Sequence, residues 1–325
     1  MNLEEFSFIE SIRQPSYKQP SLIKGIGDDA AVIRNSSQDL VTAVDTFAEG
    51  IHFLPSTMTP FDIGYKALAA NISDLAAMGA TPAFYLVSIA ISKNWTTADV
   101  QEIFKGMRAI GNSFNMDLIG GDTISSESLV LSVTVMGYVN KDKARYRNSA
   151  KPGDVVFATG TLGDSQAGLH LLFNPEELCA DRSYFVKRHQ QPSPRVLFAE
   201  KLSVLQRVTL NDISDGIASE ANEIAEASQV DIHLNYEQLP VHSGMKAFNV
   251  ELKDKWILSG GEDFELLGTV SPDAWAYVKD SAAATGTEIK EIGSVSQCKD
   301  IKPSVRLLKN NNEMILQKSG YNHFK

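Results

Sequence analysis

Five segments of the chain share one pattern, in which an apolar or small-residue stretch leads to an aspartate. They are Gly27-Asp28-Asp29, Val44-Asp45-Thr46, Asn71-Ile72-Ser73-Asp74, Gly121-Asp122-Thr123 and Asn211-Asp212-Ile213-Ser214-Asp215-Gly216. A single aspartate at a turn usually accepts hydrogen bonds from neighbouring backbone N–H groups. If the carboxylates of these five segments converge, their repulsion is large, because two unit charges about 4 Å apart repel by roughly 4 kcal/mol at an effective dielectric of about 20. Either these carboxylates are apart in space, or bound cations hold them together.

Oxygen-only sites rich in carboxylates select hard cations, so the aspartates predict Mg²⁺. The glycines of Gly25-Ile26-Gly27 and Gly120-Gly121 would let backbone N–H groups approach phosphate oxygens closely. Metal ions and glycine loops together supply what phosphoryl transfer needs, because that chemistry depends on positioning and charge neutralisation. The expected chemistry is therefore magnesium-dependent phosphotransfer.

The common nucleotide-binding motifs are absent or defective. Gly25-Ile26-Gly27-Asp28-Asp29-Ala30 matches GxGxxA, but its aspartates would face a pyrophosphate, and the residues after it favour a strand over the required helix. Gly106 and Gly111 have P-loop spacing, but Asn112-Ser113 replaces the Lys-Ser/Thr pair. The protein-kinase motifs HRD and DFG do not occur. A kinase with this sequence would use neither common scaffold.

Length and composition limit the alternatives. The 325 residues predict two domains, since a typical domain holds about 100–200 residues. The net charge of -10 argues against a nucleic-acid partner, because phosphate backbones select basic surfaces. No apolar run approaches the roughly 20 residues that a membrane span needs, and the acidic N-terminus lacks a signal sequence. The cysteines, Cys179 and Cys298, form no metal-ligand or disulfide pattern. We expect a cytoplasmic protein without membrane attachment.

The elements that would position the aspartates alternate without a regular βαβ rhythm, which predicts an α+β fold. Helices are expected at 61–78, 97–114, 164–173, 181–190, 194–206 and 217–228, and strands at 40–44, 84–91, 129–139 and 155–158. The polar, turn-rich segment 140–153 predicts a boundary between domains 1–140 and 141–325. Asp45 is expected at the end of an inner strand, Gly120-Gly121 in a turn, and Asp212 in a turn. Trp256-Ile257-Leu258 resembles a strand. Arg188 and His189, within Lys187-Arg188-His189, are interpreted as a solvated helix end or as secondary nucleotide contacts.

The ordered motifs resemble one family over nearly the whole chain. They are Gly25-Ile26-Gly27-Asp28-Asp29, Asp45-Thr46 with Glu49-Gly50-Ile51-His52-Phe53, Asn71-Ile72-Ser73-Asp74-Leu75-Ala76-Ala77-Met78-Gly79-Ala80, Gly120-Gly121-Asp122-Thr123, Asp212-Ile213-Ser214-Asp215-Gly216, Ser259-Gly260-Gly261-Glu262-Asp263-Phe264-Glu265-Leu266 and Gly320-Tyr321-Asn322-His323-Phe324. This set resembles the thiamine-monophosphate kinase family. Each motif is weak alone, but their order along the chain is specific.

The resemblance implies a transferase that uses ATP to phosphorylate thiamine monophosphate to thiamine diphosphate, the last step of thiamine diphosphate biosynthesis. It also implies the two-domain fold of aminoimidazole ribonucleotide synthetase, in homodimers whose N-terminal domains pair strands across the interface. In such proteins an N-terminal domain carries dimerisation, metal and nucleotide binding, and a C-terminal domain completes the nucleotide and substrate site. The nucleotide lies between the two domains.

The resemblance also assigns residues. Several magnesium ions per site are implied, with Asp29, Asp45, Asp74, Asp122, Asp212 and Asp215 as ligands. Nucleotide contacts fall on Gly121, Asp122, Arg147 and Ser214, and substrate contacts on His52, Glu262 and Tyr321. Asp28 would mainly shape its loop. Because Ala43-Val44 replaces the Ser-Thr of some members, a metal contact there would need backbone carbonyls.

The acceptor phosphate is largely ionised near neutral pH, so the reaction needs no strong general base. We therefore expect direct in-line transfer without an enzyme nucleophile. Two alternatives stay open. A sister enzyme of the same fold would show another substrate segment or a catalytic C-terminal cysteine, which 320–325 lacks. A non-catalytic nucleotide- or thiamine-phosphate-binding protein would keep the scaffold alone.

Overall fold

The computed structural model describes residues 12, 14, 16–24, 32–33 and 37–320. Asp28, Asp29 and Tyr321 therefore lie outside the described residues. The chain forms two compact units. The first comprises Met1–Leu75 and Ala80–Ala144, and the second comprises Ala76–Gly79 and Arg145–Lys325.

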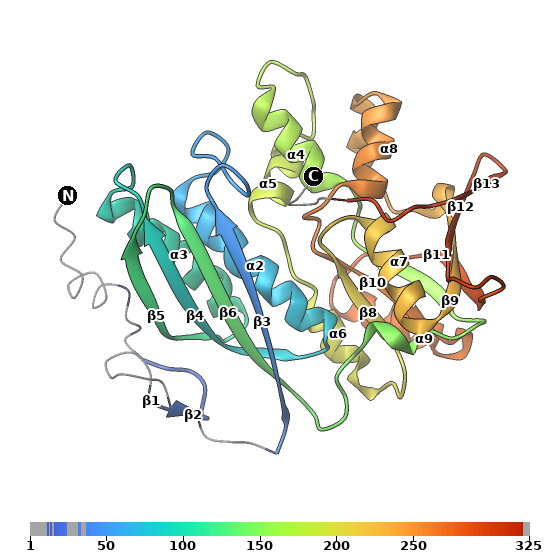
Figure 1. Cartoon of the computed structure of the whole chain (residues 1–325), viewed down its shortest axis with the longest axis horizontal. Helices are drawn as coiled ribbons and strands as arrows, with labels where there is room; N and C mark the ends of the chain where they lie inside the picture. Colours follow the sequence, from blue (N-terminus) through green and yellow to red (C-terminus); the bar gives the residue numbers. More distant parts are fainter. Residues whose placement is uncertain (1–11, 13, 15, 25–31, 34–36, 321–325) are drawn as a thin grey trace. The chain divides into compact units, whose positions relative to one another are not determined.

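The first unit is built on a four-stranded sheet with the order β3-β6-β4-β5 (Figure 1). The strands are β3 (Asp39–Ala48), β4 (Thr81–Ile91), β5 (Asp117–Ser125) and β6 (Val130–Val139), and the helices are α2 (Pro60–Ala77) and α3 (Thr97–Ser113). Only β4 and β5 are parallel; the other neighbours are antiparallel. A short hairpin-like pair, β1 (Leu22–Lys24) and β2 (Val32–Ile33), lies outside this sheet.

Helices cover one face of this sheet, whereas on the other face Leu22 of β1 and Ile33 of β2 pack near Phe84 and the rest carries no helix among the described residues. In β6, Leu131, Val133 and Val135 are fully buried, while the residues between them are half-exposed. This alternation is typical of a strand with one face against the core. Helices α2 and α3 cross closely over that face, since a side chain at Gly64 would overlap the Ile103 carbonyl.

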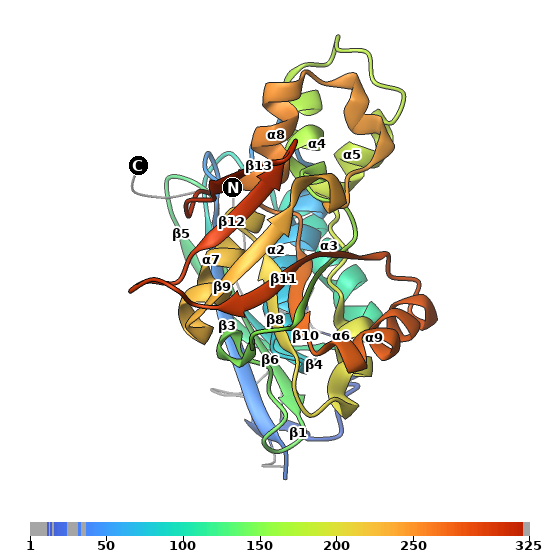
Figure 2. The ribbon, with the colours of Figure 1, turned by 90° about the vertical axis from the view of Figure 1, so that its right-hand side faces the viewer.

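The second unit is built on a seven-stranded sheet with the order β13-β12-β9-β11-β7-β10-β8, in which only β9 and β12 pair in parallel. The strands are β7 (Val155–Thr159), β8 (Thr209–Ile213), β9 (Val230–Asn235), β10 (Glu265–Val270), β11 (Ile289–Gln297), β12 (Val305–Lys309) and β13 (Asn312–Ile315). The helices are α4 (Asp164–Phe173), α5 (Arg182–Gln190), α6 (Val196–Lys201), α7 (Ile217–Ser228), α8 (Val250–Ser259) and α9 (Pro272–Ala284). Figure 2 shows α4, α5 and α8 gathered beyond one end of the sheet.

Alternate residues of β7 show how the helices enclose this sheet. Val156 belongs to a core that includes Ala221 and Ile224 of α7. Phe157 points the other way and stacks on Trp275 of α9, with ring centroids 5.7 Å apart. Helices therefore cover both faces. No helix among the described residues has the length and hydropathy of a membrane span.

The expected helices at 61–78, 97–114, 164–173, 181–190 and 217–228 are confirmed within two residues at each end. The helix expected over 194–206 is shorter, because α6 ends at Lys201 and a 3₁₀ turn follows. The expected strand at Trp256-Ile257-Leu258 is wrong. These residues end helix α8, whose first turn is capped by the Asn249 side chain.

Three expectations about the aspartate segments are also wrong, because the strands continue through their polar residues. Asp45 was expected at the end of an inner strand, whereas β3 is an edge strand, and the other two segments were expected in turns. Asp45 lies within β3, Gly120-Gly121 within β5, and Asp212 within β8. Pairing with the neighbouring strands supplies the backbone hydrogen bonds that these residues would otherwise seek in a turn.

Candidate active site

Asp45 lies on β3, an edge strand of the first unit, and its backbone N–H donates to Asn71 Oδ1 over 3.0 Å. Asn71 is fully buried, and its own amide donates to the Ala67 carbonyl over 2.9 Å. This side chain therefore ties helix α2 to the strand at Asp45. Asp74 follows one helical turn after Asn71, on the same side of α2. The structure thus brings together the two segments that carry Asp45 and Asp74.

Asp45 is half-buried, and burial raises the pKa of its carboxyl above the ordinary value. A nearby cation stabilises a carboxylate in such a place. Asp45 is therefore suited to binding a metal ion.

Asp122 is exposed on β5, at the opposite edge of the same sheet. Its neighbour Gly121 pairs with Val87 of β4, and a side chain at position 121 would overlap the Val87 carbonyl. Close packing against β4 therefore explains why position 121 is a glycine. Because neighbouring strands lie about 4.8 Å apart, three strand spacings separate Asp122 from Asp45 by roughly 14 Å. The two carboxylates do not form a pair within this sheet.

His52 lies in the loop that follows β3. The Ala48 backbone N–H donates to His52 Nδ1 over 3.1 Å, and the ring packs against Phe47 with centroids 5.0 Å apart. The loop itself is anchored by Glu49, which accepts hydrogen bonds from the Trp95 indole and the Leu129 backbone N–H. Since Nδ1 accepts, the ring proton of neutral His52 is on Nε2, which makes that nitrogen a donor.

In the second unit, β8 leads Asp212 into the turn at Ser214 and Asp215. Glu220 of α7 holds this turn: its Oε1 accepts the Ser214 N–H over 3.1 Å and the Asp215 N–H over 2.8 Å. Glu220 is 2% exposed. Burial raises the pKa of Glu220 to about 8, nearby carboxylates act in the same direction, and the Asp215 hydrogen bond opposes them. Sequence analysis missed Glu220; its only signal was an acidic residue in the first turn of a helix.

Arg147 lies beside β8, the strand that leads into this turn. Its Nε donates to Asn211 Oδ1 over 2.9 Å, and its Nη1 lies 3.0 Å from Glu223 Oε2. Lys318 pairs with the other oxygen of Glu223 over 3.0 Å. About half of the Arg147 side chain is exposed (53%), so the guanidinium is held by Asn211 and Glu223 yet open to a ligand.

The Gly260–Glu265 loop packs onto the same turn. The Glu262 N–H donates to the Ser214 carbonyl over 2.7 Å, and a side chain at Gly261 would come within 2.5 Å of that oxygen. Ser319 reaches the same place, since its hydroxyl lies 2.7 Å from that of Ser259. Three distant segments therefore meet at the Asp212–Asp215 turn, and Tyr321 follows the last of them in sequence.

The expectation of a solvated end at Lys187-Arg188-His189 is wrong. His189 is 1% exposed, and the Arg188 side chain is 12% exposed. Arg188 is buried because it meets Glu265, a fully buried carboxylate that also binds Arg195. Burial acts to raise the pKa of Glu265, but the two arginines outweigh it, and the pKa is lowered.

Among the described residues, no three His, Cys, Asp or Glu side chains form a group that could hold a metal ion. The predicted ligands are divided between the units, with Asp45, Asp74 and Asp122 in the first and Asp212 and Asp215 in the second. Their chemistry fits a hard cation, because all are carboxylates and a cation would offset the cost of burying the Asp45 carboxylate.

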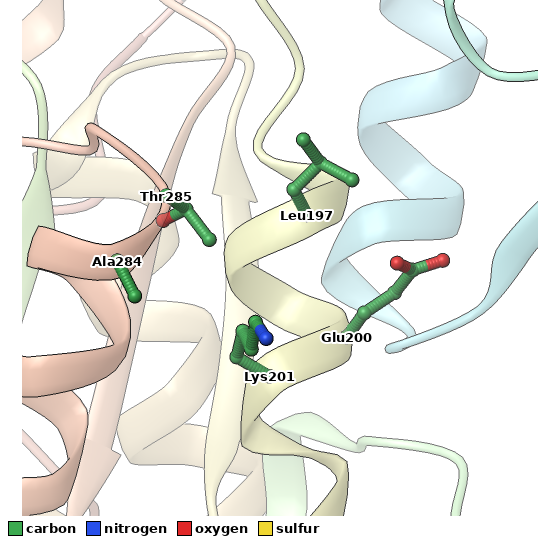
Figure 3. Close-up of a pocket in the computed structure, with 5 residues that line it drawn as sticks. All are labelled: Leu197, Glu200, Lys201, Ala284 and Thr285. Carbon is green, nitrogen blue, oxygen red and sulfur yellow. The ribbon is translucent and has the colours of Figure 1, made fainter.

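A cavity of about 550 Å³ lies between α6 and the end of α9 in the second unit (Figure 3). Its walls are formed by Leu197, Glu200, Lys201, Ala284 and Thr285. None of the predicted site residues contributes to it.

Comparison with known proteins places this geometry in a family. Residues 27–139 match the N-terminal domain and residues 151–306 the C-terminal domain of AIR synthase related proteins. These matches define the class of two-domain proteins to which the fold and the aspartate segments correspond.

Within that class, the chain is 46% identical to "Thiamine-monophosphate kinase" of Bacillus subtilis (strain 168), over 99% of this chain and 100% of the relative. The crystal structure of thiamine-monophosphate kinase from Stenotrophomonas maltophilia K279a has a TM-score of 0.84 at 32% identity, covering 94% of this chain and 97% of that one. "AaThiL complexed with AMPPCP and TMP" has a TM-score of 0.75 at 29% identity, covering 93% and 92%. The chain belongs to the thiamine-monophosphate kinase family.

Proposed function

We propose that this protein transfers the γ-phosphoryl group of ATP to the phosphate of thiamine monophosphate, the final step in making thiamine diphosphate. One observation carries the proposal: Arg147, the Asp212–Asp215 turn and the Glu262 loop meet in one place in a chain of this family. A related structure holds AMPPCP, an ATP analogue, together with TMP. A cytoplasmic location belongs to the proposal, supported by two cysteines that are free thiols.

The residues divide by role. Arg147 and Ser214, with Gly121 and Asp122, would bind the nucleotide, while His52, Glu262 and Tyr321 would hold thiamine monophosphate. Asp29, Asp45, Asp74, Asp122, Asp212 and Asp215 would hold Mg²⁺. Bound Mg²⁺ would neutralise the repulsion between two anionic phosphates. In this division, residues up to 140 supply dimerisation, metal and nucleotide contacts, and residues from 141 complete the nucleotide and substrate site.

No side chain acts as a nucleophile in this proposal. The acceptor oxygen is already anionic, so Arg147 and the ring N–H of His52 need only orient charged groups and balance their charge. The phosphoryl group then passes directly between the two substrates. A single turnover with γ-labelled ATP should leave no label on the denatured protein, and a stable labelled chain would contradict direct transfer.

The deciding experiment measures ADP formation with and without thiamine monophosphate. We expect turnover only with both substrates, and thiamine diphosphate as the product. ATP hydrolysis at a rate that does not depend on thiamine monophosphate would favour a sister enzyme of the same fold. Binding of both ligands without product would favour a non-catalytic binding protein.

Two substitutions of His52 separate its two ring nitrogens. Asparagine places an oxygen near the position of Nδ1 and keeps the acceptor for the Ala48 N–H, whereas glutamine reaches toward Nε2. If Nε2–H contacts the acceptor phosphate, His52→Asn should raise KM for thiamine monophosphate about tenfold or more, and His52→Gln should raise it less. KM for ATP is the internal control. The reverse order would assign His52 to shaping its loop.

We also propose a homodimer formed through the first unit. The face of its sheet opposite α2 and α3 carries large exposed apolar side chains, Leu40 (55%), Val44 (59%) and Ile124 (57%), which is typical of an interaction surface. Strands β3 and β5 are the sheet edges, so strand pairing between chains would involve an aspartate-bearing strand.

Leu40→Lys tests the dimer. A lysine at an apolar interface should weaken association at least about tenfold, which corresponds to roughly 1.4 kcal/mol. Sedimentation equilibrium measures the change. Leu178→Lys is the matched control, since Leu178 is 94% exposed in the second unit. Equal dimer dissociation constants for both variants and the parent would place the interface elsewhere.

A further inference from the structure

The Gly260–Glu265 loop has an unusual backbone. Glu262 and Phe264 adopt φ values of 69° and 50°, in the left-handed region that residues other than glycine rarely occupy. Each such residue is strained and persists only where its surroundings hold it. Contacts around the loop must therefore offset this strain.

One set of contacts comes from the Asp212–Asp215 turn. The Glu262 N–H donates to Ser214, and the Phe264 N–H donates to the Ile213 carbonyl over 2.9 Å. These two hydrogen bonds fix the loop backbone at the left-handed residues. They leave the direction of the Glu262 carboxylate undetermined.

A second set comes from Arg188 on helix α5. Its Nη2 donates to the Asp263 carbonyl over 3.2 Å and to Glu265 Oε1 over 2.7 Å. The Asp263 carboxylate in turn accepts the Gly163 N–H over 2.7 Å and the Ser165 N–H over 3.1 Å, at the start of helix α4. The loop is thus fastened to two helices on the side away from the turn.

His189, the next residue of α5, contacts the Glu262 side chain. Its Nδ1 lies 3.0 Å from Ser165 Oγ and 3.7 Å from Glu262 Oε2. His189 is almost fully buried, whereas the Glu262 side chain is 23% exposed. His189 Nδ1 therefore lies between Ser165 at the start of α4 and the Glu262 carboxylate, which is accessible to a ligand.

We propose that Arg188 and His189 are positioning residues: Arg188 holds the backbone of the loop, and His189 directs the Glu262 carboxylate toward the phosphate acceptor. The identity of that acceptor rests on the proposed function, whereas the positioning rests on contacts within the second unit alone. Helix α5 is then the element that sets the acceptor affinity, although neither residue needs to touch the substrate.

The test compares His189→Asn with His189→Leu in the full chain. Asparagine carries an N–H₂ near the position of Nδ1, and leucine fills similar space without a donor. We expect His189→Leu to raise KM for thiamine monophosphate about tenfold, KM for ATP to change less than about twofold, and His189→Asn to restore most of the difference. Hydrogen exchange without substrates is measured in parallel, and should quicken at 259–266 in His189→Leu only.

The outcomes separate the two proposals. If the parent protein does not phosphorylate thiamine monophosphate, the proposed function fails, and the exchange data still decide the positioning. Three results would overturn the positioning proposal. They are unchanged exchange at 259–266, faster exchange throughout the second unit, and equal increases in the KM values for thiamine monophosphate and ATP. If His189→Leu does not fold, Ser165→Ala removes the ring's other contact and should raise the KM for thiamine monophosphate about threefold. No change in Ser165→Ala would also overturn the positioning.

Discussion

Asp45→Asn and Asp122→Asn are each expected to lower kcat by roughly 10²–10³-fold at saturating substrates, while the protein stays folded. Asparagine keeps the size of the side chain and removes the charge that a metal ion requires. For Asp45 the folded state should lose nothing, because burial raises the pKa of this carboxyl and the neutral amide avoids that cost. Initial rates over a range of Mg²⁺ concentrations, with circular dichroism of each variant, make the measurement.

Asp39→Asn is the matched control for Asp45→Asn. Asp39 lies at the start of the same strand, is exposed, and accepts the Asp142 N–H over 2.8 Å. It should keep the parental rate and the parental dependence on Mg²⁺. Near-parental turnover in both Asp45→Asn and Asp122→Asn would exclude a metal role for these aspartates.

Sequence patterns predicted the positions of helices and strands better than they predicted the conformation of the aspartate and glycine residues expected at their ends. Helix α2 was recognisable because its apolar residues recur with helical spacing, and β6 because its residues alternate. Asp45 was expected at a strand end, and Asp122 and Asp212 in turns, because aspartate and glycine usually break strands. Their place inside strands depends on partners far away in sequence, such as Leu266 opposite Asp212.

The structure brings together several of the residues that the ordered motifs assigned to one site. Arg147, the Asp212–Asp215 turn and Glu262 meet in the structure, and Asn71 joins Asp45 to the helix of Asp74. Local patterns did not find the buried charges that support them. Arg188 looks like part of a solvated basic cluster until Glu265, 77 positions later, appears as its partner. Such pairs are set by tertiary packing, which composition and spacing do not encode.

Glu265→Met is expected to destabilise the protein by about 3–5 kcal/mol, because it leaves two buried arginines without their carboxylate. Glu265 is fully buried, and it accepts hydrogen bonds from Arg188, Arg195 and the Thr159 hydroxyl. Urea unfolding followed by tryptophan fluorescence measures the change, and Trp256 and Trp275 report on the second unit. Replacing Glu265, Arg188 and Arg195 together by methionine should recover a large part of the loss, since no charge is then left unpaired.

The pH dependence of the unfolding free energy is a second, independent test of this prediction. The pKa of Glu265 is lower in the folded protein than the ordinary value of about 4.3, so the folded state binds this proton less readily than the unfolded chain. The stabilisation by the carboxylate is therefore complete above about pH 5, and it declines as the pH falls through the unfolded-state pKa toward the folded one. The difference in unfolding free energy between the parent and Glu265→Gln should stay constant from about pH 8 to pH 5 and shrink at lower pH, because glutamine does not titrate. A difference that grows on acidification would mean that the two arginines do not hold Glu265 ionised, and the buried network would then need another explanation for its stability.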